Sequence, residues 1–231
     1  MARVAAIEKG KEVEKMKLRV VGLTLFAAAL LCAVLLRPAG AKDEKMTIVA
    51  FGDSLTAGLG LPENESFPAQ LEAALKARGK DVSVVNAGVS GDTTSSAAQR
   101  LDWSLPEGAS AVIVELGGND ALQGIPPEGT QANLAKIIEA AQGKGLPVLL
   151  AGMEAPRNMG KDYVDAFHAI YPELAAKYGV VFYPFFLDGV ALDDGLMQED
   201  GIHPNAKGVA KIVDQIMPKV DELLAQVKSK D

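Results

Sequence analysis

The feature that most restricts the fold is the regular alternation of two hydrophobic patterns along the chain. Five short runs of apolar and β-branched residues are separated by stretches in which apolar residues recur every three or four positions. The runs are 46–52, 82–86, 111–116, 147–152 and 180–183. Because strands that alternate with helices pair through right-handed crossovers, the sequence predicts an α/β fold with a parallel sheet covered by helices on both faces.

Apolar residues with helical spacing predict four of the connecting helices. They are Leu71, Ala74 and Leu75; Leu134, Ile137, Ile138 and Ala141; Tyr163, Ala166, Phe167, Ile170 and Leu174; and Ile212, Val213, Ile216, Val220, Leu223 and Leu224. We treat the runs 111–116 and 147–152 as apolar throughout, as expected of strands that are buried on both faces. With 231 residues and 48% apolar composition, the chain is large enough for one domain with a full core.

The N-terminal segment has the pattern of an export signal. Residues 20–36 form an apolar run without charge, which follows a basic segment at 15–19 and precedes a group of small residues that ends at Ala41. We therefore predict an N-terminal extension and signal peptide over residues 1–41, with cleavage after Ala41, and a globular domain over residues 42–231. The protein is then expected in the periplasm or outside the cell, without a stable membrane anchor.

Two other interpretations of this segment stay open. An uncleaved signal anchor is one, although 17 apolar residues lie at the lower edge of what spans a bilayer. A lipoprotein modified at Cys32 fits less well, because Leu31 before it is not small and the apolar run continues past it. Translation from Met16 would place a conventional start next to the basic residues.

The charge and cysteine content of residues 42–231 exclude several classes of function. This part contains 16 Lys and Arg against 27 Asp and Glu residues, a net charge of −11. Such an acidic surface repels phosphate backbones, so we expect no nucleic-acid partner. The only cysteine of the chain precedes residue 42, which excludes disulfides, thiolate nucleophiles and cysteine-ligated zinc from the globular part.

A serine follows the first predicted strand at once, and polar segments follow the others. Ser54 ends a Gly-Asp-Ser turn, which taken alone is also an ordinary helix-capping sequence. The segments 86–94 and 117–120 follow the second and third strands, and 200–205 precedes the last helix. Because ligands of open parallel sheets bind beyond the carboxyl ends of the strands, we expect these segments to form one site.

His203 is the candidate base for Ser54. Pro204 disfavours a helical conformation at His203 and suits the first turn of the helix that follows, so the imidazole is presented from a turn. Asp200, three residues earlier, can accept the Nδ1 hydrogen and leave Nε2 facing the serine. His168 lies within a helical pattern and is expected to be an ordinary helix residue. A metal site at 200–203 lacks further histidine or cysteine ligands, so we expect no metal.

Acyl transfer also needs hydrogen-bond donors at the point where the carbonyl oxygen becomes negative. The backbone N–H of Ser54 at a helix start is one candidate. Gly91 can bring its backbone N–H close because it has no Cβ in the way, and Asn119 can offer an uncharged side-chain amide. Each of these residues is also a common turn residue, so their coincidence at several strand ends carries more weight than any one of them.

Four segments, FGDSLTAG, NAGVSGDTT, ELGGND and DGIHPN, resemble the signature blocks of the GDSL (SGNH) hydrolase family. The likeness covers residues 46–226 and is greatest to the bacterial periplasmic thioesterases, lysophospholipases and arylesterases. It implies a flavodoxin-like three-layer α/β/α sandwich with a five-stranded parallel sheet. It also implies Ser54 as nucleophile, Asp200 and His203 as its triad partners, Ser54, Gly91 and Asn119 as the oxyanion hole, and no cofactor.

The resemblance further implies hydrolysis of carboxylic esters and thioesters of acyl chains, with a small-molecule acyl ester, thioester or lysophospholipid as substrate. We expect the acyl chain to contact Leu122, Ile125 and Pro126 in the loop after Asn119, although this loop would equally well pack on itself.

A second candidate wall for the acyl chain consists of Met153, Met159 and Tyr163, for which ordinary packing is the competing interpretation. A carbohydrate O-deacetylase of the same superfamily would need a more polar, shallow cleft, and a non-catalytic acyl- or lipid-binding protein would not need the five catalytic residues together. We expect a monomer.

Overall fold

The structure, a computed structural model, describes residues 45–227, so the export signal predicted over residues 1–41 lies outside the described residues. Five parallel strands form one sheet in the order β2-β1-β3-β4-β5. They are β1 (Met46–Gly52), β2 (Val82–Gly88), β3 (Ala111–Glu115), β4 (Val148–Ala151) and β5 (Val181–Tyr183). This is the strand order of flavodoxin-like doubly wound sheets, which confirms the predicted fold class.

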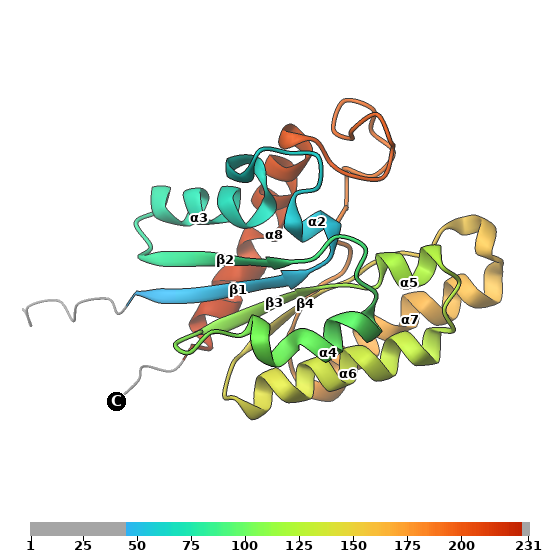
Figure 1. Ribbon diagram of the computed structural model, residues 1–231, viewed down its shortest axis with the longest axis horizontal. Coiled ribbons are helices and arrows are strands. Elements are labelled where there is room, and N and C mark those ends of the chain that lie inside the picture. Colours follow the sequence, from blue (N-terminus) through green and yellow to red (C-terminus); the bar gives the residue numbers. More distant parts are fainter. Residues whose placement is uncertain (1–44, 228–231) are drawn as a thin grey trace, which may run out of the picture. The chain divides into compact units, whose positions relative to one another are not determined.

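Helices cover both faces of the sheet, as Figure 1 shows. One layer holds α3 (Phe67–Ala77) and α8 (Ala206–Ala225), and the other holds α4 (Thr94–Ser104), α6 (Pro127–Gly143) and α7 (Lys161–Tyr178). Short helices α2 (Ser54–Ala57) and α5 (Gly118–Leu122) follow the carboxyl ends of β1 and β3. The 3-10 turns η1 (Glu63–Glu65) and η2 (Arg157–Met159) complete the connections. Within residues 45–227, no helix combines the length and apolar character needed to cross a bilayer.

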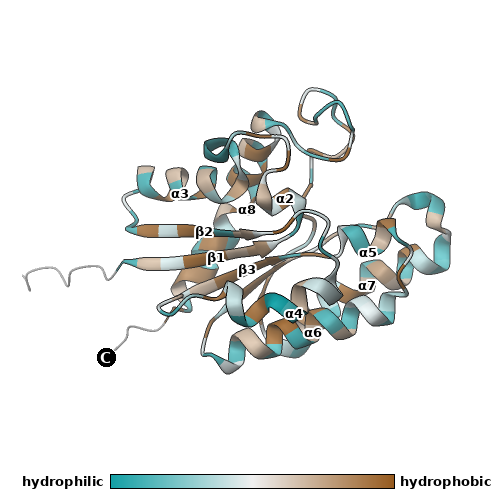
Figure 2. Ribbon diagram, viewed as in Figure 1, coloured by the Kyte–Doolittle hydropathy of each residue, from teal (hydrophilic) through white to brown (hydrophobic). Residues whose placement is uncertain are grey.

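The core forms where the strands meet the apolar faces of the helices, and Figure 2 shows hydrophobic colours concentrated there. Every residue of β3 and β4 is buried, as expected of central strands in a covered parallel sheet. The prediction that the run 111–116 is apolar throughout is wrong at Glu115, which ends β3 with no exposed surface. A carboxyl group in this place needs a compensating partner, and Thr56 Oγ1 donates to its Oε2 at 2.7 Å.

The apolar spacing of the sequence does not predict α4. Only Thr94, Ala97 and Leu101 are buried along this helix, too few to give a clear hydrophobic stripe. Its start is specified by side-chain capping instead. Thr93 and Ser96 form a reciprocal capping box, in which each side chain accepts the backbone N–H of the other residue.

The segment after Asn119 is also more helical than the loop that we predicted. Residues 118–122 form α5, and α6 already starts at Pro127. Proline suits the first position of a helix, because the N–H that it lacks would have no intrahelical partner there. The connection between these helices therefore consists of residues 123–126 alone, which leaves less chain to cover a substrate.

Candidate active site

The strand order changes direction between β1 and β3, and the turns after these two strands build one side of the site. Asp53 caps α2, and its Oδ1 accepts the backbone N–H of Leu55 at 3.0 Å. Ser54 is thereby held as the first residue of α2, with its side chain directed out of the turn toward His203. The predicted capping function of the Gly-Asp-Ser turn thus belongs to Asp53, which leaves the serine hydroxyl available.

The long connection between β5 and α8 builds the opposite side and lies beside the segment after α2 in Figure 1. Gln198 ties the two segments together by donating to the carbonyl oxygen of Leu59 at 2.8 Å. Asp200 shapes the end of the connection, because its Oδ1 accepts the backbone N–H groups of Ile202 at 2.9 Å and His203 at 3.0 Å. This local turn presents the imidazole toward the carboxyl ends of the strands.

Three side chains form a continuous hydrogen-bonded series across the site. Asp200 Oδ2 lies 2.6 Å from His203 Nδ1, and His203 Nε2 lies 2.9 Å from Ser54 Oγ. With the Nδ1 hydrogen donated to the carboxylate, Nε2 is the acceptor for the serine hydroxyl. Such a series can remove a proton from Ser54 and hold the resulting imidazolium against a carboxylate.

The charge on Asp200 is well supported in this arrangement. The backbone N–H of His203, the His203 side chain and the backbone N–H of Ile202 together lower the pKa of Asp200 to about 2. The carboxylate is therefore ionised throughout the neutral range. Its side chain is 46% exposed, and contact with water also favours the charged form. His168 takes no part in the site, since it lies exposed on α7 as predicted.

Pro204 has a different place from the predicted one. It precedes the helix cap and pairs with Met197 in an isolated antiparallel bridge. Asn205 is the N-cap of α8, and its Oδ1 accepts the backbone N–H groups of Lys207 and Gly208. The same asparagine donates to the carbonyl oxygen of Met197 at 3.1 Å, so the helix start also anchors the connection that carries the imidazole.

Asn119 lies in α5 beside the serine turn, and both hydrogens of its amide have protein partners. Nδ2 donates to Asp53 Oδ2 and to the backbone carbonyl of Asp92, each at 3.0 Å. The amide thereby joins the segments that follow β1, β2 and β3. A substrate oxygen that approaches Nδ2 must share or replace one of these two bonds. The sequence alone did not indicate that both hydrogens of the amide have protein partners.

Gly91 lies in an exposed turn next to Asp92, whose N–H donates to the carbonyl oxygen of Val89 at 3.1 Å. Its φ is +86°, a conformation that side chains with a Cβ rarely adopt. A Cβ built on it would meet no protein atom within 4 Å. Glycine is therefore required by the turn geometry, which differs from the steric reason that we predicted.

Two carboxyl groups are buried beneath the serine turn. Burial raises the pKa of Asp53 to about 6, against the lowering effect of its bonds from Leu55 and Asn119. Burial and the neighbouring charge of Asp53 raise the pKa of Glu115 well above its usual value. Oε1 of Glu115 has no hydrogen-bond partner among the described residues. The raised pKa favours the uncharged form of Glu115, which is less costly to bury in this apolar layer than the charged form.

Asp120 connects the segment after β2 to the segment after β3. Its carboxylate is completely buried and accepts the backbone N–H of Thr94 at 2.8 Å and the Thr94 hydroxyl at 2.5 Å. The Thr130 hydroxyl at 3.1 Å adds a bond from α6. The sequence alone indicates no function for Asp120, because its function depends on partners from two other helices.

A cavity of about 290 Å³ opens beside the hydroxyl of Ser54. Its walls are mostly apolar, and its lining consists of Asp53, Ser54, Leu55, Gly118, Asn119, Leu122, Met153, Glu154, Pro156, Leu187, Ile202 and His203. Of the predicted substrate contacts, Leu122 and Met153 belong to this lining. Missed contacts such as Leu187 and Ile202 lie in the connection that follows β5, so proximity to strand ends was the usable signal.

The other predicted contacts, which are Ile125, Pro126, Met159 and Tyr163, do not line this cavity. Two of them pack together instead, since the Tyr163 hydroxyl donates to the carbonyl oxygen of Ile125 at 2.8 Å. This bond joins the start of α7 to the connection before α6. Tyr163 and Ile125 therefore pack against each other, which is the competing interpretation given for them above.

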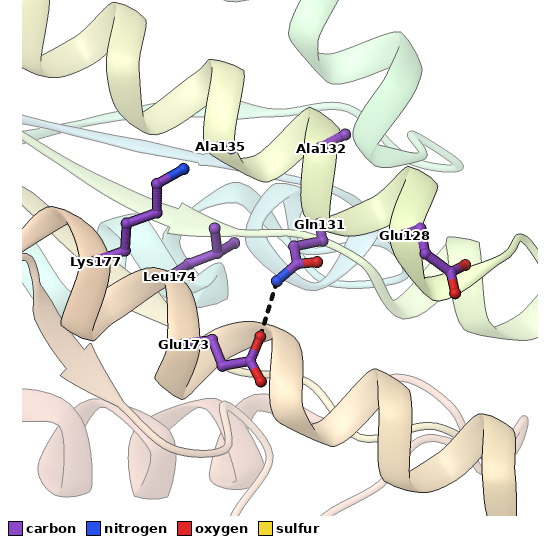
Figure 3. A pocket seen from close by; sticks show the side chains of 7 residues that line it. All are labelled: Glu128, Gln131, Ala132, Ala135, Glu173, Leu174 and Lys177. Carbon is purple, nitrogen blue, oxygen red and sulfur yellow. Dashed lines mark hydrogen bonds between the residues drawn. The ribbon is translucent and has the colours of Figure 1, made fainter.

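A second hollow, of about 340 Å³, lies between α6 and α7 (Figure 3). Figure 3 shows Gln131 and Glu173 facing each other across it, and the amide donates to the carboxylate at 3.0 Å. The described residues that line it include neither a histidine nor a serine. No group of His, Cys, Asp or Glu side chains within residues 45–227 is arranged to hold a metal ion.

Comparison with known proteins gives one consistent result. Residues 50–211 match the model of the GDSL-like lipase/acylhydrolase family. Esterase TesA of Pseudomonas aeruginosa is 40% identical over 179 residues, which cover 77% of this chain and 89% of that protein. The Escherichia coli K12 protein named thioesterase 1/protease 1/lysophospholipase L1 is 37% identical over 179 residues, which cover 77% and 85% of the two chains. The crystal structure of AlinE4, an SGNH-hydrolase family esterase, is 46% identical, with a TM-score of 0.66 over 78% of this chain and 97% of that one.

Proposed function

Since this chain belongs to the GDSL-like lipase/acylhydrolase family and is an esterase, we propose that it hydrolyses acyl esters and thioesters through Ser54, His203 and Asp200. The observation that carries the proposal is the series of hydrogen bonds from Asp200 through His203 to Ser54, at the mouth of an apolar cavity. A nucleophile, its base and the group that orients the base are what acyl transfer requires.

The chemistry proceeds in two steps. Ser54 Oγ attacks the acyl carbonyl while His203 Nε2 takes its proton, and the imidazolium then protonates the leaving alcohol or thiol as the carbonyl–leaving group bond breaks. Water next attacks the acyl-enzyme with His203 as base, which releases the acid and restores the serine. Asp200 keeps the imidazole in the tautomer that accepts at Nε2 and stabilises its charged form, so this sequence of steps needs no cofactor.

The developing oxyanion is stabilised by the backbone N–H groups of Ser54 and Gly91 and by the Asn119 amide. Asn119 supports this role by its place in the cavity lining next to the serine. Because its two hydrogens are donated to Asp53 and to the Asp92 carbonyl, one of these bonds weakens as the oxyanion forms. Such an exchange favours the transition state over the substrate, since the neutral carbonyl oxygen competes less well for the donor.

The substrates are small-molecule esters whose acyl part is apolar. Leu122, Met153 and Pro156 offer an acyl chain a hydrophobic surface next to the nucleophile. Thioesters and lysophospholipids have the same reacting carbonyl, and the name of the Escherichia coli relative includes both activities. A carbohydrate O-deacetylase is less well supported, because most of the cavity wall is apolar.

We further propose that the enzyme acts as a monomer in the periplasm or outside the cell, after removal of residues 1–41. The apolar run at 20–36 and the small residues that end at Ala41 support export. N-terminal sequencing of the protein purified from its host tests the cleavage position, and an N-terminus before residue 20 would contradict it. Light scattering of the same sample tests the oligomeric state.

The function is tested by hydrolysis of p-nitrophenyl esters from acetyl to palmitoyl and of an acyl-CoA. We expect turnover by the wild-type enzyme and by a Ser95→Ala control, which alters an exposed serine on α4, and none above background by Ser54→Ala. We also expect medium acyl chains to be preferred over acetyl, because the cavity wall is apolar. Full activity in Ser54→Ala would contradict the nucleophile, and a preference for acetylated sugars would favour the deacetylase.

A further inference from the structure

Arg100 lies on α4, the helix that the apolar spacing does not predict, and its guanidinium reaches the ends of two strands. Nη2 donates to the carbonyl oxygen of Gly52, the last residue of β1, and Nη1 donates to that of Ala87 in β2, both at 2.9 Å. The guanidinium also lies over the ring of Phe51 at 4.3 Å from its centre. Only one residue separates Gly52 from Ser54, so the guanidinium is hydrogen-bonded to the end of the strand from which the turn with Ser54 starts.

The same guanidinium holds the turn that contains Gly91. Nε of Arg100 lies 2.5 Å from Asp92 Oδ2, and Asp92 Oδ1 accepts the hydroxyl of Ser96 at 2.8 Å. The two charged side chains are only 17% and 11% exposed. An ion pair that is this shielded is costly to break, because removal of one partner leaves a charge with little water around it.

Asp92 links Arg100 to the Asn119 amide. Its side chain is held by Arg100, while its backbone carbonyl accepts one hydrogen of Asn119 Nδ2 at 3.0 Å. One residue thus connects the cation on α4 to the amide on α5. The three candidate oxyanion donors come from the turns after β1, β2 and β3. Arg100 binds the end of β1 at Gly52 and the turn after β2 at Asp92, and Asp92 in turn accepts a hydrogen of Asn119 after β3.

We propose that Arg100 is a positioning residue for the oxyanion hole, which it keeps in register by holding the turns after β1 and β2 against each other. This inference rests on the proposed function. The fork geometry of the guanidinium is essential, because four of its hydrogen bonds run to four different residues: Gly52, Ala87, Asp92 and Ser104. A lysine keeps the charge but directs its donors from one atom, so it cannot reproduce these bonds.

A purely structural role is the competing explanation, and it makes a different kinetic prediction. Loss of folded protein lowers the concentration of competent sites and leaves the rate per site unchanged. A displaced oxyanion hole lowers kcat per site with little change in KM, because the lost interaction is made mainly in the transition state. It also weakens the binding of an alkyl boronic acid, which forms a tetrahedral adduct with the serine, in proportion to the loss of kcat/KM.

The test compares Arg100→Lys with Arg78→Lys, with competent sites counted by titration with a fluorophosphonate. Arg78 is the matched control, because it pairs with Asp221 on the α8 side of the sheet and lines no part of the cavity. We expect kcat per titrated site to fall about 10- to 100-fold in Arg100→Lys, with KM within about threefold of wild type. Boronate affinity should weaken by a similar factor, and Arg78→Lys should match wild type in all three quantities.

A second variant keeps the inference testable if Arg100→Lys does not fold. Asp92→Asn retains the backbone carbonyl for Asn119 and removes only the carboxylate that binds Arg100, so a loss of kcat and boronate affinity of at least about fivefold is expected. Wild-type kcat per site in either folded variant would overturn the inference. Ser54→Ala is measured in parallel: if it is inactive while Arg100→Lys is normal, the positioning role fails and the proposed function stands, whereas activity in Ser54→Ala refutes the proposed function itself.

Discussion

The two sides of the cavity are built in opposite ways. On the side of Ser54 and Asn119, the supporting groups are buried and their hydrogen bonds join residues that are far apart in sequence, such as Asp120 with Thr94 and Thr130. On the side of His203, the orienting carboxylate of Asp200 is 46% exposed, and its bonds reach no further than three residues along the chain. The side of the proposed nucleophile, called the nucleophile side below, is thus a product of tertiary packing, whereas the proposed base is presented by a local turn.

This difference predicts how activity and stability are coupled on the two sides. A substitution at Asp200 removes few tertiary contacts, so it should change the chemistry while the fold remains intact. A substitution at Asn119 or Thr94 removes bonds between elements, so it should lower both activity and stability.

The largest effect after loss of the nucleophile is expected for Asp200→Asn. An amide in this place cannot hold His203 in the tautomer that accepts at Nε2, so kcat should fall about a thousandfold to ten-thousandfold. Thermal unfolding should shift by no more than about 2 °C, because the side chain is half exposed and its bonds are local. Asp194→Asn, an exposed acid in the same connection, is the control in kinetic and calorimetric measurements. A large loss of stability would contradict the proposed independence of this turn.

Asn119→Ala should lower kcat about 100- to 1,000-fold, since one oxyanion donor is lost. Unlike Asp200→Asn, it should also cost about 1–3 kcal/mol of unfolding free energy, because Asp53 Oδ2 and the Asp92 carbonyl lose a donor in a mostly buried place. Urea unfolding and steady-state kinetics measure the two quantities, with the exposed Asn158→Ala as control. Little loss of activity in a folded variant would remove Asn119 from the oxyanion hole.

Thr94→Val tests the nucleophile side without touching the cavity. It keeps the side-chain shape and the backbone bond to Asp120 but removes the hydroxyl donor, which leaves a buried carboxylate less well satisfied. We expect a loss of about 1–3 kcal/mol in stability and a reduction of kcat of only a few fold. A stability equal to wild type in urea unfolding would show that Asp120 does not need this bond.

The smallest effect concerns the pH dependence of stability. A carboxyl group whose pKa is raised by folding binds its proton more tightly in the folded state, so its contribution is present at low pH and is lost as pH rises through the folded pKa. For Asp53 this loss extends from the ordinary pKa of 3.8 to about pH 6, and for Glu115 it extends upward from the ordinary pKa of 4.5. Glu115→Gln should therefore be less sensitive to pH than wild type above about pH 5, where the wild-type side chain keeps its proton in the folded state and loses it in the unfolded state.

Urea unfolding at several pH values measures this prediction, with the exposed Glu107→Gln as control. The control should retain the wild-type slope, since it leaves both buried carboxyl groups in place. A parallel slope in Glu115→Gln would show that Glu115 does not titrate differently in the folded and unfolded states.

The same contrast explains which parts could be predicted from the sequence. The strands follow from continuous apolar runs, and the fold class follows from their alternation with helices. The proximity of Asp200 to His203 follows from their spacing in one turn, because three residues suffice to define it. The helix α4 was missed because its start depends on capping and its buried face is narrow.

The supporting residues of the nucleophile side could not be predicted, because their partners are distant in sequence. Nothing near Arg100 in the chain indicates that it binds the carbonyl oxygens of Gly52 and Ala87. Glu115 was overlooked within an apolar run for a similar reason, since its burial depends on Thr56 and Asp53 from another strand end. The cavity lining likewise combines residues from the four connections after β1, β3, β4 and β5, and only Leu122 and Met153 were predicted among its apolar members.

The proposed mechanism through Ser54, His203 and Asp200 is tested most directly by identifying the side chain that reacts with an alkyl fluorophosphonate, with mass spectrometry of the intact protein and its peptides. We expect one adduct per chain, on the peptide that contains Ser54, and labelling slowed by a large factor in Asp200→Asn although that variant is folded. An adduct on another residue, or equally fast labelling when the Asp200 carboxylate is removed, would contradict the proposed series from Asp200 through His203 to Ser54.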